Sequence, residues 1–297
     1  MRIPLSFLIL AFIAGISCSS GSQPAFDGQV AYAYLLEQCN LGPRNPGSSG
    51  HQKGLELIAG KLRKLSPQVK VQEFTGKNAL TGDSVKLYNV TVSFHPLQPN
   101  RVLLCTHWDT RPYADKDPDS SSRSTPILGA NDGASGTAIL LHLAEIISRT
   151  QPKFGVDMVF FDGEDMGKSG ETETYALGSQ HFANNLSGYR PEYAILLDMV
   201  GDRDLKIYQE EYSKWYAAET VELLWSRAEK LKLDCFVDSV GYTLWDDHLP
   251  LIQKGIQCAD IIDFDYPYWH TLNDTPDKCS AQSLEKVGRL LISILYD

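Results

Sequence analysis

The stretch VFFDGEDMG, Val159–Gly167, decides which kind of sheet this chain can form. An apolar run that starts at Val156 passes directly into a polar segment containing three carboxylates, Asp162, Glu164 and Asp165. Such a short run, ended by a glycine, is typical of a strand buried on both faces. In an open α/β sheet, ligands bind beyond the carboxyl ends of the strands. Crowded carboxylates repel one another, so this end requires a cation or a shared proton. A single strand that ends in this way is more commonly followed by an acidic, solvated turn. A functional site is indicated only if other strands of the chain end in the same way.

Length and composition predict one large domain. The chain has 297 residues, of which 43% are apolar, and this is enough for a sizeable core. We expect a single domain over residues 28–297 and a monomer. The net charge of −10 argues against nucleic acid or an anionic membrane surface as a partner, and suits a cationic group such as a peptide N-terminus.

The first residues have the pattern of an export signal. Arg2 precedes an apolar segment, residues 5–16, that is too short to span a membrane comfortably. We therefore expect a signal peptide over residues 1–18, a flexible tether over residues 19–27 and a periplasmic location. The segment resembles a bacterial lipoprotein signal with Cys18 as the acylated residue, although Gly15 stands where an aliphatic residue is usual. Plain secretion is the alternative, and membrane contact is expected only through a lipid on Cys18.

The remaining five cysteines include at least one that is unpaired. No two cysteines have CxxC spacing, so a cysteine zinc site is not expected. Cys105 lies in an apolar run and is expected to be a buried free thiol.

Hydrophobic periodicity predicts alternating helices and strands. The helices are expected at residues 29–39, 51–65, 137–147, 177–186, 214–231 and 280–295, with a short one opened by residues 245–250. The strands are expected at residues 69–74, 85–94, 101–106, 156–161, 193–199, 205–208, 233–237 and 258–264. Ser49 is a candidate N-cap, residues 205–208 a short edge strand, and the first two strands an antiparallel pair near a sheet edge. The order implies an α/β fold, a three-layer αβα domain whose mixed, mostly parallel central sheet is covered by helices.

Several strand ends carry metal-binding or acid–base residue types. His107 follows one strand, and Asp109 stands two residues further, where a carboxylate can orient an imidazole. Asp132 comes just before an apolar helix, and by itself it would be interpreted as an N-cap rather than a ligand. The full set, with no Lys or Arg expected nearby, is His107, Asp109, Asp132, Glu164, Asp165, Asp198, Asp246 and His270. Two histidines and several carboxylates form a zinc ligand set with carboxylates left for general acid–base work.

These motifs resemble one known family, the zinc aminopeptidases and the glutaminyl cyclases that share their fold. The matching segments follow the family order over nearly the whole mature chain: GPRNPGSSGH (42–51), THWD (106–109), GANDGASG (129–136), FFDGED (160–165), LGSQHF (177–182), LLDMVGD (196–202), DDHLP (246–250) and WHTLNDT (269–275). Each segment is weak evidence alone, but the set is specific.

The resemblance implies two alternative metal sites. In the dinuclear aminopeptidases the ligands would be His107, Asp132, Asp165, Asp198 and His270. In the cyclases a single zinc ion would be held by Asp132, Asp165 and His270. Glu164 would then be the general acid and base, with Asp198 and Asp246 hydrogen-bonded near it.

Two features favour the cyclases, whose members convert N-terminal glutaminyl residues of peptides and proteins to pyroglutamate. Trp269, directly before His270, resembles their pocket wall, although it could equally be a plain core aromatic, and the DDHLP segment resembles theirs. The loop RPYAD (111–115) resembles the bacterial secreted branch. Two positions depart from the pattern: Asp165 replaces the longer Glu of animal cyclases, and Tyr175 stands where a second pocket tryptophan is usual. The alternatives are a dinuclear zinc aminopeptidase and a catalytically silent peptide-binding lipoprotein.

Overall fold

The computed structural model describes residues 23–297, so the predicted signal peptide and Cys18 lie outside the described residues. A six-stranded sheet runs through the middle of the fold in the order β1-β2-β4-β3-β5-β8. Its strands are β1 (Val69–Lys77), β2 (Ser84–Phe94), β3 (Arg101–His107), β4 (Gly155–Phe161), β5 (Ala194–Asp198) and β8 (Cys258–Ile262). The strands β4, β3, β5 and β8 are parallel, and β1 and β2 form the antiparallel edge. The predicted α/β fold with a mixed, mostly parallel sheet is confirmed.

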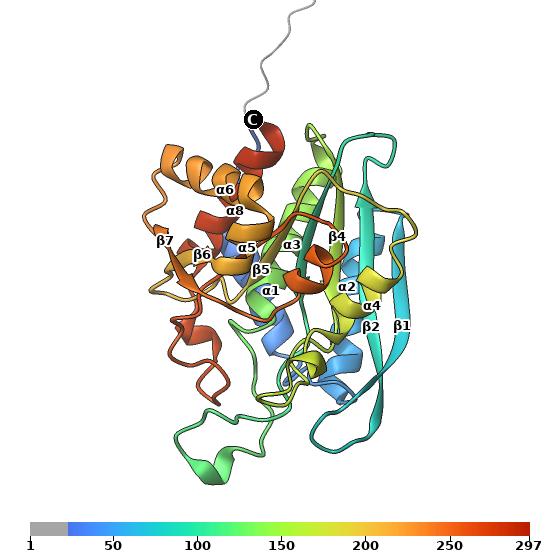
Figure 1. The fold of residues 1–297 in the computed structure, drawn as a ribbon, viewed down its shortest axis with the longest axis vertical. Coiled ribbons are helices and arrows are strands. Elements are labelled where there is room, and N and C mark those ends of the chain that lie inside the picture. The colour runs from blue at the N-terminus through green and yellow to red at the C-terminus, as the bar shows by residue number, and fades with distance from the viewer. Residues whose placement is uncertain (1–22) are drawn as a thin grey trace, which may run out of the picture.

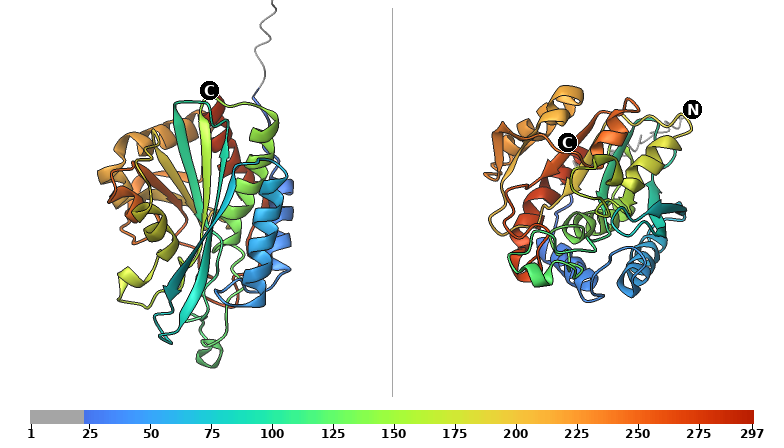
Figure 2. Two further views of the ribbon diagram at one scale, coloured as in Figure 1. Left: turned by 90° about the vertical axis from the view of Figure 1, so that its right-hand side faces the viewer. Right: turned by 60° about the horizontal axis from the view of Figure 1, so that its bottom comes forward.

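Helices cover both faces of this sheet, as the edge-on view in Figure 2 shows. One layer contains α1 (Gly28–Cys39), α2 (Ser49–Arg63), α3 (Ala134–Arg149) and α8 (Ala281–Tyr296), and the other contains α4 (Leu177–Asn184), α5 (Glu211–Tyr216) and α7 (His248–Ile252) (Figure 1). Neighbouring residues of a central strand enter different cores: Leu104 packs toward the α3 layer and Leu103 toward the α4 layer. Both are buried, which explains why this strand is continuously apolar.

The register of the parallel strands aligns their carboxyl ends. His107 at the end of β3 pairs with Phe161 at the end of β4, and Asp198 at the end of β5 pairs with Ile262 at the end of β8. The residues that follow these strands therefore emerge at one edge of the sheet, at the bottom of Figure 1. Short 3₁₀ turns, η1 (Ser120–Ser122), η2 (Thr172–Thr174) and η3 (Pro276–Lys278), lie in the connecting loops.

Two strand predictions were wrong in part. The predicted edge strand at residues 205–208 is β6 (Ile207–Glu210), and it pairs with β7 (Phe236–Tyr242) in a separate two-stranded sheet rather than with the main sheet. β7 also begins later than residue 233, because Leu233 and Cys235 pack into the core as part of the preceding loop. Local periodicity does not show which sheet a short strand joins.

The helix predicted over residues 214–231 is in fact two helices, α5 and α6 (Ala218–Lys230), separated at Ala217. No glycine or proline marks this break in the sequence. Glu210 fixes the start of α5 by accepting the N–H groups of Tyr212 and Ser213. Both helices contact β7 and β8, but α5 packs against α7 whereas α6 packs against α8, so the break lets the two helices pack on different helices.

The structure also tests two predictions about single residues. The N-cap of α2 is Ser48, whose hydroxyl accepts the N–H of His51, and not Ser49. Cys105 is buried and free, as predicted, and so are the other four cysteines of the described region. Within residues 23–297, no helix is both long and apolar enough to cross a bilayer.

Candidate metal and acid–base site

The strand ends bring three ligand-type side chains together from distant parts of the chain. Asp132 precedes α3, Asp165 follows β4, and His270 follows β8. Their ligand atoms all lie within 4.8 Å of one another. His270 Nε2 is 3.0 Å from Asp165 Oδ1 and 3.7 Å from Asp132 Oδ2. We call these three residues the triad.

The triad has the donor set that zinc uses in proteins, and one carboxylate oxygen of each aspartate lacks a hydrogen-bond partner. All three side chains are buried, yet Oδ2 of Asp132 and Oδ2 of Asp165 have no hydrogen-bond partner. Unpaired buried carboxylate oxygens are costly unless something neutralises them. One imidazole and two carboxylates, with a position left open, fit a catalytic zinc ion.

A second group shares Asp132 with the triad. His107 Nε2 lies 3.0 Å from Asp198 Oδ1 and 3.2 Å from Asp132 Oδ1, and these ligand atoms also fall within 4.8 Å of one another. The two oxygens of Asp132 thus face different groups. The five ligand positions of a dinuclear site are therefore all assembled.

Asp132 is not the N-cap of α3. The capping position is Gly133, with φ of 97°, and no side chain caps the helix there. A Cβ at Gly133 would lie 2.4 Å from the carbonyl oxygen of Asp109, so only glycine fits this position. Asp274 accepts the N–H groups of Asn131 and Asp132 at 2.8 and 3.2 Å, which fixes the loop and leaves the Asp132 carboxylate free to face the site.

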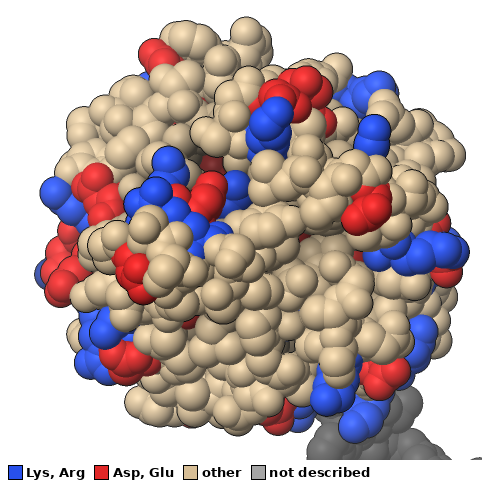
Figure 3. All heavy atoms as spheres, turned by 90° about the horizontal axis from the view of Figure 1, so that it is seen from below, with Lys and Arg blue, Asp and Glu red and all other residues tan. Residues whose placement is uncertain are grey.

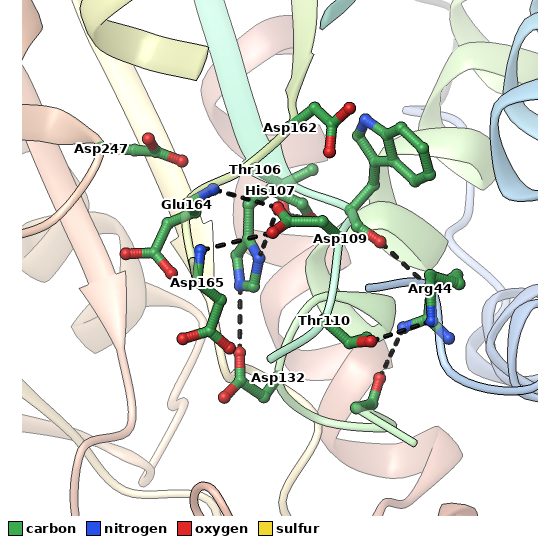
Figure 4. A network of polar contacts seen from close by, with 12 residues as sticks. Arg44, Thr106, His107, Asp109, Thr110, Asp132, Asp162, Glu164, Asp165 and Asp247 are labelled. Carbon is green, nitrogen blue, oxygen red and sulfur yellow. Dashed lines mark hydrogen bonds and ion pairs between the residues drawn. The ribbon is translucent and has the colours of Figure 1, made fainter. Parts of the chain in front are cut away.

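Asp109 has a different position from the one expected for an orienting carboxylate. Its Oδ1 is 3.7 Å from His107 Nδ1, but its two oxygens accept the N–H groups of Glu164 and Asp165 at 3.2 and 3.3 Å. Figure 4 shows it between His107 and this turn. Asp109 therefore holds the backbone that carries both the acid–base candidate and a triad residue.

A cavity of about 210 Å³ opens onto these side chains. Its polar wall includes Asp132, Glu164, Asp165, Asp198, Asp246 and His270, and its apolar wall includes Tyr175, Leu244, Trp245, Phe264 and Trp269. Trp269 is partly buried and its ring stacks on His270, with centroids 3.8 Å apart. Leu244, Trp245 and Phe264 were not predicted as site residues, because no local pattern in a sequence distinguishes a pocket wall from a core. A larger cavity, of about 760 Å³, lies between α6 and β7 and contains none of the predicted site residues.

The carboxylates of the cavity shift one another's ionisation. Burial, together with the charges of Asp165 and Asp246, raises the pKa of Glu164 well above its usual range. Burial and the neighbouring Asp198 raise the pKa of Asp246 to about 6. Burial is thus the first cause of the raised pKa of Glu164, and repulsion from the neighbouring carboxylates is the second.

Asp246 also belongs to another buried group, whose other members, His248 and Asp260, were not predicted as site residues. The ligand atoms of Asp246, His248 and Asp260 lie within 4.8 Å of one another, and His248 Nε2 is 3.1 Å from Glu210 Oε2. Asp260 stands inside the otherwise apolar strand β8, CADII, and this charge in a buried strand is the pattern that could have revealed it.

The expectation that no cation lies near the acidic set was wrong. Arg111, buried and only 1% exposed, lies 3.4 Å from Asp165 Oδ1 through its Nη1. It belongs to the polar loop after β3, which looks solvated in the sequence but folds back over the site. The outer face of this end, seen in Figure 3, shows acidic and basic side chains interspersed among uncharged ones.

Arg44, from the segment GPRNPGSSGH, holds the two loops around the site together (Figure 4). Its side chain is fully buried, and it donates to the carbonyl oxygens of Trp108, Leu128 and Gly129 at 3.1, 3.2 and 2.7 Å. These carbonyls belong to the loop after β3 and to the loop before α3. A charged group buried in this way is retained only because its donors are satisfied.

We expect Arg44→Met to lower the free energy of unfolding by about 3–5 kcal/mol, because three buried or partly buried carbonyl oxygens lose their donor. Chemical denaturation would measure the loss. Arg149→Met, at the exposed end of α3, is the matched control and should change stability by less than about 0.5 kcal/mol. A loss at Arg44 no larger than that of the control would contradict this role.

Comparisons with known proteins agree with the predicted resemblance. The family described as Peptidase family M28 matches residues 89–295. The structure of Tannerella forsythia glutaminyl cyclase is 40% identical, with a TM-score of 0.88, and the match covers 92% of this chain and 99% of that one. A Zn-dependent exopeptidase from Parabacteroides distasonis is 35% identical, with a TM-score of 0.90, over 93% of this chain and 100% of the other.

A curated relative points to the aminopeptidases. Aminopeptidase YwaD of Bacillus subtilis is 25% identical over 278 residues, which is 87% of this chain. The match spans only 54% of that relative's length. The matched proteins thus include both cyclases and peptidases.

Proposed function

Because this chain belongs to peptidase family M28, we propose that it is a zinc-dependent glutaminyl-peptide cyclotransferase. The observation that carries the proposal is the placement of Trp269, which stacks on His270 and forms the apolar wall of a small cavity closed by the triad and Glu164. Such a cavity suits one flexible amide side chain packed against an indole. The similarity to the Tannerella cyclase over nearly all of both chains supports it.

Asp132, Asp165 and His270 would hold a single zinc ion in this proposal. Zinc bound there would supply a Lewis acid for the γ-carboxamide oxygen of an N-terminal glutamine. The α-amino nitrogen of the substrate attacks the carboxamide carbon, a C–N bond to the leaving nitrogen breaks, and ammonia departs. The product is an N-terminal pyroglutamyl residue.

Glu164 would move the proton in this reaction. Free α-amines have a pKa of about 7.7–8.0, so a weak base is sufficient. The raised pKa of Glu164 suits a group that takes the amine proton and returns it to the leaving ammonia. Asp198 and Asp246 line the same cavity and would tune this group, while Trp269 and Tyr175 exclude water and fix the side chain.

The second candidate is a dinuclear aminopeptidase, and a specific observation favours it. His107 and Asp198 are assembled with Asp132 as a second ligand group. In that case Glu164 would activate a water molecule to cleave the first peptide bond. The proposed substrates are peptides or proteins with a free N-terminus in either case, and the N-terminal sequence supports export.

Mass spectrometry of a glutamine-initiated peptide, incubated with purified zinc-loaded protein, tests the proposal. We expect loss of ammonia with the chain otherwise intact. The same peptide with an acetylated N-terminus is the control and should not react, because its nitrogen is no longer nucleophilic. Release of the free first residue would establish the aminopeptidase instead, and an unchanged peptide would favour the silent binding protein.

A further inference from the structure

The loop after β3 contains an arginine and an aspartate that pair beside the triad. Arg111 makes a bidentate contact with Asp115: its Nε and Nη2 donate to Oδ1 and Oδ2, each at 2.8 Å. The Arg111 side chain is 1% exposed and that of Asp115 is 31% exposed. A guanidinium has its N–H donors in a rigid plane, so this pairing fixes the orientation of both groups.

Asp115 faces the ring nitrogen of His270 that points away from the triad. Its Oδ1 lies 3.2 Å from His270 Nδ1, an ion-pair contact that is not itself a hydrogen bond. A negative carboxylate this close favours the proton on Nδ1 and leaves the lone pair of Nε2 facing Asp165 and Asp132.

The same loop also restrains the backbone of His270. The N–H of Lys116, the next residue after Asp115, donates to the carbonyl oxygen of His270 at 3.2 Å. His270 has φ of 55°, a left-handed conformation that is uncommon for a residue other than glycine. Such a conformation persists only where surrounding contacts hold it.

Arg111 meanwhile holds the second triad residue. Its Nη1 donates to the backbone carbonyl oxygen of Asp165 at 3.0 Å and lies 3.4 Å from Oδ1 of the same residue. The Asp165 N–H donates to Asp109 at 3.3 Å, so the backbone of Asp165 is held from both sides. An aspartate reaches less far than a glutamate, and its backbone must therefore be held closer to the metal position.

We propose that Arg111 and Asp115 are positioning residues that set Asp165 and His270 in one geometry for the metal. The pair contacts two triad residues at once, and its Arg111 places a positive charge beside the Asp165 carboxylate. An isolated surface ion pair would contribute little to stability. This pair instead contacts the side chains of both Asp165 and His270. The proposal rests on the metal site of the proposed function and does not depend on which reaction that site performs.

Zinc affinity, measured by competition with a chromophoric chelator, tests this proposal. Asp115→Ala is expected to weaken zinc binding about 10–100-fold, which is the usual effect of removing a group that supports a metal ligand. Asp115→Asn retains an acceptor oxygen and should restore part of the affinity. Arg111→Lys keeps the charge but loses the planar fork, and should weaken binding as well. Asp119→Ala is the control, because this residue is in the same loop and its side chain accepts hydrogen bonds from Ser121 and Ser122, not from the triad.

The visible spectrum of the cobalt-substituted protein gives a second readout. A change of ligand geometry shifts its absorption bands, whereas a loss of stability alone does not. Zinc affinities of Asp115→Ala and Arg111→Lys within twofold of the control would overturn the proposal, and so would an unchanged cobalt spectrum. If the wild-type protein binds zinc but forms no pyroglutamate, the proposed reaction fails while the affinities still decide the role of the pair.

Discussion

Glu164→Gln is expected to lower kcat about 10²–10⁴-fold while the zinc content remains that of the wild-type protein. The amide cannot take the proton from the substrate amine or return it to the leaving group. Glu164 is not one of the triad residues, so the metal should stay bound. Stopped assays on a glutamine-initiated peptide, together with elemental analysis of the same samples, would measure both quantities.

Glu171→Gln is the matched control for this variant, because Glu171 lies in the same connection but pairs with Lys168 and does not line the cavity. Its turnover should equal that of the wild type. A near-normal rate for Glu164→Gln would mean that another group transfers the proton. Loss of zinc in that variant would instead place Glu164 among the ligands.

Asp132→Ala and His270→Ala are each expected to remove the metal and, with it, nearly all turnover. Each substitution deletes one of the three donors whose atoms lie within 4.8 Å of one another. Elemental analysis after dialysis should find only a small fraction of the wild-type zinc, because a site with two donors remaining binds weakly. An unchanged zinc content in both variants would rule out the triad as the metal site.

Two further variants make this measurement specific. His181→Ala, in α4, is the control for loss of a histidine outside the cavity and should leave the zinc content unchanged. His107→Ala distinguishes a site with one zinc ion from a site with two, since His107 belongs only to the second ligand group. An unchanged zinc content in His107→Ala agrees with one ion per chain, and a fall by about half would establish two.

The order and type of the site residues could be predicted because each belongs to a local pattern. A short apolar run followed by carboxylates, as at Phe161 and Glu164, marks the carboxyl end of a buried strand wherever it occurs. Parallel strands then bring such ends to one edge whatever their separation in the chain. For this reason Asp132, Asp165 and His270 could be expected at one edge together with the other five site residues. That these three would hold one ion was implied by the family resemblance and not by the local pattern.

Other features depend on contacts that no local pattern records. Asp132 has the sequence context of a helix cap, and only the loop held by Asp274 shows that its carboxylate turns into the site. The break at Ala217 lets α5 pack against α7 and α6 against α8, while both helices contact β7 and β8. In both cases tertiary packing overrides the local preference.

The sequence by itself therefore determined the fold class, the strand ends and the chemistry available there. Only the tertiary structure decided how these groups are held. Asp109 accepts the backbone N–H of Glu164, and Arg111 donates to the carbonyl oxygen of Asp165, which is 54 residues away in the sequence. The physical reason is that hydrophobic periodicity reflects burial along one element, whereas a buried ion pair depends on which loops the finished sheet brings together.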